Sequence, residues 1–205
     1  MSQNYFQILL DLIFPKEKVV YEISSSKNFG NKRIEDLGII IWVATEYNDS
    51  AVHDLIHKVK VDRQFAFSSD LSNIFNVKVK EHFVTVGRIL IIPVPPDPKR
   101  LLQNGFALGY ILAKNLSENL GLDFVELLQK KSSTTKQSYL NREERLTNLN
   151  DKIDLYESKT NIANYDEIWI IDDITTTGAT LFECQKIIQK NHPFVTVKLL
   201  ALASN

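Results

Sequence analysis

The segment of residues 168–180 constrains the fold of this chain more than any other. Its first four residues, Ile-Trp-Ile-Ile, are typical of a parallel strand that is buried on both faces. Asp172 and Asp173 follow directly, and a helical pattern then runs from about Ala179 to Lys190. A buried strand, a short polar loop and a helix predict an α/β fold. Such folds bind ligands at the carboxyl ends of their strands.

The loop carries groups that suit a phosphorylated sugar. Two adjacent carboxylates can bind the hydroxyl groups of a polyol or a hydrated metal ion. The residues after them supply hydroxyl groups and backbone N–H groups, which bind anions, and the following helix directs the positive end of its dipole toward the same place. These residues are Thr175, Thr176, Thr177, Gly178, Ala179 and Thr180. The alternative is a structural turn in which the acids only cap a helix or face solvent.

Strands and helices alternate along the remainder of the chain. Apolar runs predict strands at residues 39–44, 87–94, 124–128 and 195–202, and helical periodicity predicts helices at residues 49–60, 65–83 and 104–120. This alternation predicts a mostly parallel twisted sheet with helices on both faces. We expect residues 1–38 to form an N-terminal helix with a small appendage or hood, and residues 39–205 to form the α/β domain.

A second informative loop follows the predicted strand at residues 87–94. Prolines recur through residues 93–98 and restrict the backbone, and Lys99 and Arg100 then supply two cations. A rigid turn with two cations after a buried strand suits a highly charged anionic group. The alternative is a proline-rich connector with two solvated charges.

Residues 129–150 are polar and charged, as is typical of loops that close over an active site. The candidate closing residues are Lys130, Lys131, Arg142 and Arg145. The alternative for these charges is the solvated face of a surface helix.

The amino-acid composition argues against several kinds of binding partner and metal site. The 24 basic and 25 acidic residues leave a net charge of −1, which offers no general attraction to nucleic acid or to anionic membranes. A single cysteine, Cys184, excludes an internal disulfide and a multi-cysteine zinc site and suits a reducing cytoplasm. His53 and His57 are four residues apart, but no third ligand follows nearby, which argues against zinc.

No apolar run approaches the length of a membrane span, so we expect a cytoplasmic protein. Residues 2–14 have the pattern of an amphipathic helix interrupted by Asp11, without the basic start of a secretory signal. The apolar face of this helix would pack on the main domain or, alternatively, on a partner subunit in a homodimer.

Residues 172–180 resemble the loop that binds phosphoribosyl pyrophosphate in type I phosphoribosyltransferases. In that loop two aspartates, two variable positions, Thr-Thr-Gly, a small residue and Thr follow a hydrophobic run, and this chain matches it throughout. The order of the motifs resembles the ComF-like family of these proteins, which is associated with competence and DNA uptake in bacteria. Its aromatic, Leu-Ile-His and Lys pattern is matched by Tyr47, residues 55–57 and Lys60. Its proline-rich pyrophosphate loop is matched by residues 93–100, and its Gln and Glu-Arg-x-x-Asn segment by Gln137 and residues 144–148.

The resemblance implies a type I phosphoribosyltransferase-like fold and transfer of a phosphoribosyl group to an acceptor, usually a nitrogen, with release of pyrophosphate. It implies that Asp172 and Asp173 bind the ribose hydroxyls, with one of them acting as a base or holding the water shell of Mg²⁺. It further implies that Thr176, Thr177, Gly178, Ala179 and Thr180 bind the 5′-phosphate. Lys99 and Arg100 would bind pyrophosphate together with Mg²⁺, which we expect to be held mainly through the substrate. The acceptor has no recognisable signature in this chain.

The chain departs from the family pattern at two places. Many members carry a zinc ribbon of cysteines after a Phe-Pro pair, whereas Phe14 and Pro15 are present here without those cysteines. The family's Arg-Gly-Phe-Asn-Gln reads Asn-Gly-Phe-Ala-Leu at residues 104–108, which removes one cation and two amides near the pyrophosphate loop. The second change favours an alternative function, a sensor that binds phosphoribosyl pyrophosphate or a nucleotide without chemistry. A third possibility is an accessory role in DNA uptake.

Overall fold

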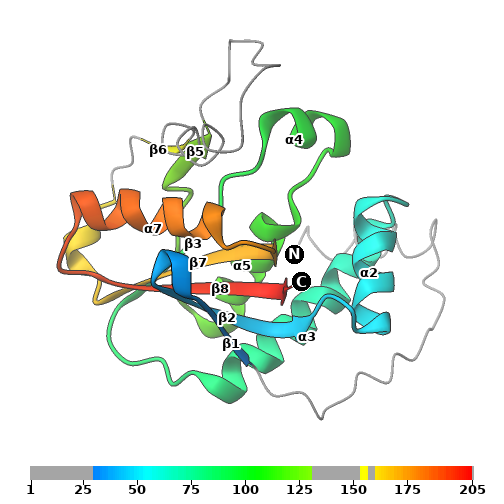
Figure 1. Cartoon of the computed structure of the whole chain (residues 1–205), viewed down its shortest axis with the longest axis horizontal. Coiled ribbons are helices and arrows are strands. Elements are labelled where there is room, and N and C mark those ends of the chain that lie inside the picture. Colours follow the sequence, from blue (N-terminus) through cyan, green and yellow to red (C-terminus); the bar gives the residue numbers. More distant parts are fainter. Residues whose placement is uncertain (1–29, 131–152, 157–159, 205) are drawn as a thin grey trace, which may run out of the picture.

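A six-stranded sheet organises the protein (Figure 1). The computed structural model describes residues 30–130, 153–156 and 160–204 of the chain. In the order β1-β2-β8-β7-β3-β4, β1 and β2 are antiparallel and every other neighbouring pair is parallel. The strands are β1 (Gly30–Ile34), β2 (Ile39–Glu46), β3 (Ile89–Pro93), β4 (Asp123–Phe124), β7 (Glu167–Thr175) and β8 (Thr196–Ser204). The predicted mostly parallel α/β sheet is confirmed.

Helices cover both faces of this sheet (Figure 1). One face packs against α2 (Ser50–Lys60), α3 (Ser68–His82) and α5 (Leu108–Leu120), and the other against α7 (Ala179–Asn191). Because successive side chains of a strand point to opposite faces, Trp169 and Ile171 of β7 enter the first core, whereas Ile168 and Ile170 enter the second. Cys184 of α7 is fully buried in the second core, as a small apolar side chain would be.

The smaller elements connect these layers. A short helix, α4 (Pro98–Asn104), follows β3, and a two-stranded antiparallel ribbon joins β5 (Leu128–Lys130) to β6 (Ile153–Leu155). Three 3₁₀ turns cover Glu35–Leu37, Phe65–Phe67 and Ile162–Asn164. The helix predicted at residues 104–120 begins only at Leu108, because Gly105 adopts a left-handed φ of 73° after α4. The strand predicted at residues 124–128 is divided between β4 and β5.

The N-terminal part of the chain is described only from Gly30. Strand β1 pairs along its length with β2, so residues 30–34 form an edge of the main sheet. The predicted helix at residues 2–14 lies outside the described residues, and the domain boundary near residue 38 stays a prediction. Within the described part of the chain, no helix combines the length and the apolar character needed to cross a bilayer.

Gly178 lies where the start of α7 packs closely against β1 and β2. It is the N-cap residue of α7 with a left-handed φ of 73°, and it is buried. A Cβ atom at this position would lie 2.8 Å from Ile41 Cδ1, 3.2 Å from Ile34 Cγ1 and 3.4 Å from Ile39 Cδ1. Only glycine therefore satisfies both the backbone angle and the packing.

We expect Gly178→Ala to destabilise the protein more than Gly121→Ala. Gly121 ends α5 with a φ of 65°, but a Cβ atom added there would meet no atom within 4 Å, so alanine costs only the left-handed strain of about 1 kcal/mol. Alanine at Gly178 adds steric overlap of about 1–3 kcal/mol. Urea unfolding of both variants measures the difference, and equal losses would show that the packing around Gly178 is loose.

Candidate functional site

The two aspartates lie inside strand β7 and not in a loop after it. The ladder between β7 and β8 continues from Asp172 opposite Ala201 to Thr175 opposite Ser204. On the other side, β3 pairs with β7 only as far as Ile171, and its last contact is the hydrogen bond that Val94 N donates to Ile171 O over 2.8 Å. The acid pair is therefore held by β8 along one edge beyond the last partner of β3. The buried Gly109 of α5 lies close to it, since a Cβ atom there would be 3.5 Å from Asp173 N and 3.7 Å from Asp172 Oδ1. The pair thus lies at the carboxyl end of a parallel strand, where α/β sheets bind ligands.

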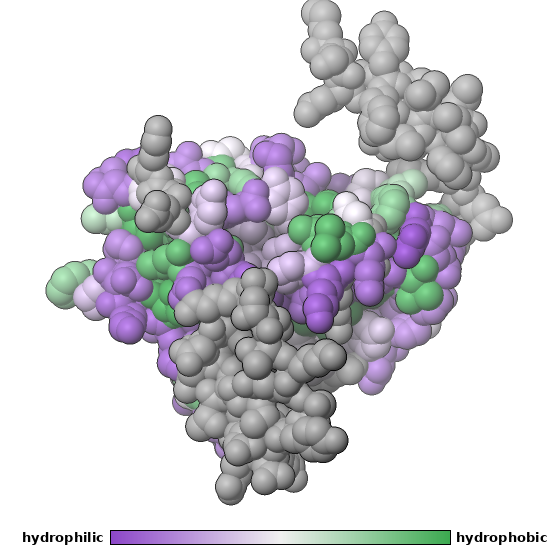
Figure 2. All heavy atoms as spheres, turned by 90° about the horizontal axis from the view of Figure 1, so that it is seen from above, coloured by the Kyte–Doolittle hydropathy of each residue, from purple (hydrophilic) through white to green (hydrophobic). Residues whose placement is uncertain are grey.

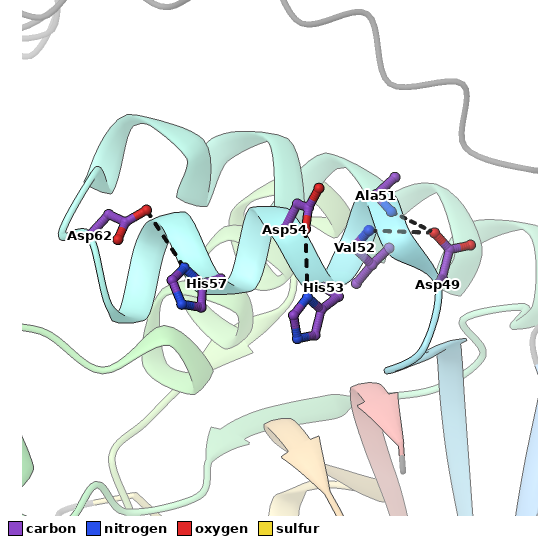
Figure 3. A network of polar contacts seen from close by, with 7 residues as sticks. All are labelled: Asp49, Ala51, Val52, His53, Asp54, His57 and Asp62. Atoms are coloured by element: carbon purple, nitrogen blue, oxygen red, sulfur yellow. Dashed lines mark hydrogen bonds and ion pairs between the residues drawn. The ribbon is translucent and has the colours of Figure 1, made fainter.

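Asp173 is tied to helix α2. Its Oδ2 lies 2.8 Å from Nζ of Lys60, the last residue of that helix, and its Oδ1 accepts a hydrogen bond of 2.7 Å from the backbone N–H of Ile174. The helix is held at its other end by Asp49, whose Oδ1 accepts from the N–H groups of Ala51 and Val52 (Figure 3). Helix α2, capped by Asp49, thus places Lys60 beside the acid pair.

Asp172 is the less neutralised member of the pair. Its Oδ1 accepts a hydrogen bond of 2.8 Å from the N–H of Asp173, and no donor among the described residues contacts its Oδ2. Burial, followed by the negative charge of Asp173, raises the pKa of Asp172 to about 7, and the charges of Lys60 and Lys130 oppose this rise. Asp172 can therefore exchange a proton near neutral pH, as a general base must.

The threonine-glycine loop joins the acid pair to α7. Thr175 is buried at the end of β7, Thr176 and Thr177 are exposed, and Gly178 is the N-cap residue of the thirteen-residue helix α7. The hydroxyl oxygen of Thr177 accepts a hydrogen bond of 3.4 Å from the N–H of Ala179. Exposed hydroxyls at the amino end of a long helix form an anion-binding arrangement.

Lys32 holds this loop from the first strand of the sheet. Its ammonium group donates to the Thr176 carbonyl oxygen and to the Ser204 hydroxyl oxygen, each over 2.9 Å. The sequence offered no signal for this contact, because Lys32 lies within a polar stretch and is 144 residues away from Thr176. The contact places one positive charge beside the predicted phosphate site.

The predicted pyrophosphate residues lie on the short helix α4. Lys99 and Arg100 fall in the first turn of this helix, which projects from the sheet in Figure 1. Lys99 is exposed, and its backbone N–H donates to Asp97 Oδ1 over 2.9 Å. Its ammonium makes no ion pair with a described residue. Among the described residues, the lysines whose charges lower the pKa of Asp172 are Lys60 and Lys130.

Lys130 is the only predicted closing residue that the structure describes. It ends β5, opposite Ile153 of β6, and its charge acts on Asp172 from the α7 side of the sheet. The Cys184 thiol lies on α7, on the same side of the sheet, and burial and the charge of Asp172 raise its pKa. Lys131, Arg142 and Arg145 lie outside the described residues, as do Gln137 and residues 144–148.

Helix α2 also carries His53 and His57, the histidine pair for which the sequence argued against zinc. The rings of His53 and His57 are 6.4 Å apart, and their Nδ1 atoms lie 3.6 Å from carboxylates of Asp54 and Asp62 respectively (Figure 3). Across residues 30–130, 153–156 and 160–204, no group of three or more histidine, cysteine, aspartate or glutamate side chains is arranged to hold a metal ion.

The face of the molecule seen in Figure 2 carries apolar patches within a hydrophilic surface. Leu101 and Leu102 of α4 are among the exposed apolar residues, at 40% and 87% exposure.

Comparison with known proteins finds similar solved structures and relatives in sequence, but no family model matches the chain. Among solved structures, an adenine phosphoribosyltransferase superposes with a TM-score of 0.45 at 16% identity over 71% of this chain and 74% of that one. The adenine phosphoribosyltransferase of Leishmania tarentolae superposes with a TM-score of 0.45 at 10% identity over 86% of this chain and 95% of that one.

Three competence proteins are similar in sequence. The competence protein ComFC of Bacillus subtilis is 32% identical over 149 residues, which are 70% of this chain and 56% of the relative. Competence protein F of Haemophilus influenzae is 29% identical over 66% of this chain and 61% of the relative, and ComFC of Streptococcus pneumoniae is 28% identical over 76% and 64%. The chain thus spans less than two thirds of the length of each. The resemblance to ComF-like proteins that the sequence motifs predicted is confirmed by these relatives.

Proposed function

We propose that this protein binds 5-phosphoribosyl 1-pyrophosphate with Mg²⁺ and transfers the phosphoribosyl group to a nucleophile, with release of pyrophosphate. The observation that carries the proposal is the position of the acid pair and the threonine-glycine loop on one continuous strand–loop–helix unit, at the carboxyl end of a parallel strand. One such unit offers carboxylates to a sugar and N–H and hydroxyl groups to its phosphate. The similarity to ComF-like proteins supports the proposal.

The strand and the loop would divide the sugar phosphate between them. Asp172 and Asp173 accept hydrogen bonds from the ribose hydroxyls. The 5′-phosphate receives N–H and hydroxyl donors from Thr176, Thr177, Gly178, Ala179 and Thr180. The helix dipole of α7 and the nearby Lys32 ammonium favour the negative charge there.

Pyrophosphate would lie toward the loop that follows β3. Lys99 and Arg100 in the first turn of α4 are the proposed cations for it, together with backbone N–H groups of the preceding loop. The described Lys130 and the predicted closing residues Lys131, Arg142 and Arg145 would cover the ligand and exclude water.

The residues present fit a hydrated Mg²⁺. This ion prefers oxygen ligands and retains several waters, and the Oδ2 of Asp172 has no donor among the described residues. Because the described part of the chain holds no cluster of three metal-binding side chains, the ion would be held mainly through ligand oxygens and water. When bound, Mg²⁺ neutralises charge on the leaving pyrophosphate.

The acids would stabilise the reacting sugar. As the bond to pyrophosphate breaks, positive charge develops on the ribose, and two carboxylates fixed in a strand favour that charge without reorganising. Asp172, with its pKa raised to about 7, is the member suited to take a proton from the attacking nucleophile.

Two other functions are candidates. A phosphoribosyl-pyrophosphate or nucleotide sensor that performs no chemistry is favoured by the Asn-Gly-Phe-Ala-Leu sequence at residues 104–108. An accessory role in DNA uptake is favoured by the names of the three relatives, all competence proteins. Pyrophosphate release in the presence of a nucleobase panel separates enzyme from sensor. A DNA titration at several salt concentrations tests the accessory role, since phosphate contacts give a steep salt dependence.

We expect the double variant Asp172→Asn, Asp173→Asn to abolish turnover and to weaken binding of the Mg²⁺ complex of phosphoribosyl pyrophosphate by at least about 100-fold. The reason is the loss of two charge-assisted acceptors for the ribose hydroxyls. Isothermal titration calorimetry measures the affinity. Glu118→Gln, which removes an exposed carboxylate on α5, is the matched control and should bind as the wild type does. Unchanged affinity in the double variant would remove the proposed site.

We expect affinity for the same complex to fall as the pH drops below about 7. A raised pKa means that Asp172 is protonated in the folded protein at pH values where an ordinary aspartate is ionised, so a proton competes there with the ligand. In Asp172→Asn this part of the pH dependence should disappear, leaving only titration of the ligand phosphates. Carboxyl ¹³C NMR checks the assignment directly, and a signal of Asp172 that titrates near pH 4 would contradict it.

A further inference from the structure

Lys60 neutralises one acid of the pair while the site holds no ligand. Its Nζ lies 2.8 Å from Asp173 Oδ2, and the side chains of Lys60 and Asp173 are 32% and 18% exposed. Since Asp173 Oδ1 already accepts from Ile174 N, both oxygens of this carboxylate are engaged. Asp172 has no comparable partner, because its only hydrogen bond within the described residues is to the N–H of Asp173 through Oδ1.

The position of Lys60 allows its ammonium group to leave. Lys60 is the last residue of α2, where the helix dipole and the final carbonyl groups favour a cation. Its side chain is partly exposed, so water can solvate the ammonium when it moves. The helix itself is held independently, by the Asp49 cap at its start and by the buried side chains of Val52, Leu55, Ile56 and Val59. Release of Lys60 therefore need not displace α2.

We propose that Lys60 is a resident counter-ion of the acid pair, and that a divalent cation bound with a sugar diphosphate competes with its ammonium group for Asp173. Both the sugar diphosphate and the divalent cation rest on the proposed function, whereas the ion pair of Lys60 with Asp173 is observed. An ammonium and a divalent cation repel each other, so they cannot both lie against one carboxylate without weakening each other's binding. Lys60 would keep the empty site from collecting metal and would set the metal concentration that ligand binding requires.

A purely structural role of Lys60 predicts a different result. If Lys60 only anchors α2, its removal lowers the stability of the fold and leaves metal binding unchanged. If Lys60 is a ligand-binding cation, its removal weakens binding of the sugar diphosphate. Only a counter-ion predicts that the divalent cation binds more tightly once the ammonium group is gone.

The test uses Mn²⁺ alone as the probe, with free ion measured by electron paramagnetic resonance. We expect Lys60→Met to bind Mn²⁺ about 10-fold more tightly than the wild type, the effect of about one pKa unit of charge interaction. Lys60→Arg keeps the charge and should behave as the wild type. Lys114→Met, which removes the exposed lysine paired with Glu118, is the matched control and should also leave Mn²⁺ binding unchanged. Adding Asp173→Asn to Lys60→Met should abolish the gain.

Circular dichroism and thermal unfolding establish that each variant is folded, and Lys60→Gln replaces Lys60→Met if the latter is not. Equal Mn²⁺ affinity in wild type and folded Lys60→Met, or a gain that survives Asp173→Asn, would overturn the proposal. Calorimetry with phosphoribosyl pyrophosphate and Mg²⁺ forms a separate arm. There, Lys60→Met should reach half-maximal binding at lower Mg²⁺, and weaker binding at every Mg²⁺ concentration would show instead that Lys60 contacts the ligand.

The two arms separate this inference from the proposed function. A gain in Mn²⁺ affinity without any binding of the sugar diphosphate supports the counter-ion and rejects the proposed ligand. Binding of the sugar diphosphate to the wild type, without a gain in Mn²⁺ affinity in Lys60→Met, supports the ligand and rejects the counter-ion.

Discussion

The pairing of β7 with β8 beyond the end of β3 is the constraint on which the candidate site depends. The ladder that continues to Thr175 keeps Asp172 and Asp173 in regular strand geometry, whereas the last partner of β3 is Ile171. The acid pair is therefore held in place by β8, and Gly109 of α5 packs against its backbone. Carboxylates fixed in this way need little reorganisation to receive a ligand.

Charge at the acid pair is balanced by lysines that come from separate parts of the chain. Lys60 of α2 contacts Asp173, and Lys130 of β5 acts on Asp172 from the opposite face of the sheet. Lys32 of β1 holds the carbonyl of Thr176, beside the proposed phosphate site. Lys60 contacts Asp173 directly, and its charge also acts on Asp172 together with that of Lys130. The two adjacent carboxylates differ because Asp173 has an ion pair, whereas burial and the charge of Asp173 raise the pKa of Asp172 to about 7.

Local patterns predicted most of the fold. The apolar run at residues 168–171, the helical pattern from Ala179 and the strand at residues 39–44 all appear in the structure as β7, α7 and β2. The errors concern boundaries and have identifiable causes. Gly105 adopts a left-handed conformation, which a helical pattern does not reveal, so the helix predicted from residue 104 begins at Leu108. Strand β7 continues through the two aspartates because β8 offers partners there, although charged residues at the end of an apolar run usually indicate that a strand has ended.

The order of an acid pair, a threonine-glycine bend and a helix could be read along the chain, since these are neighbours in sequence and their chemistry is local. The cations that contact them could not. Lys60 reaches Asp173 from helix α2, and Lys32 reaches the carbonyl oxygen of Thr176 from strand β1. Contacts across more than a hundred residues depend on strand order and helix packing, and these follow from the burial of the whole core and from no single motif.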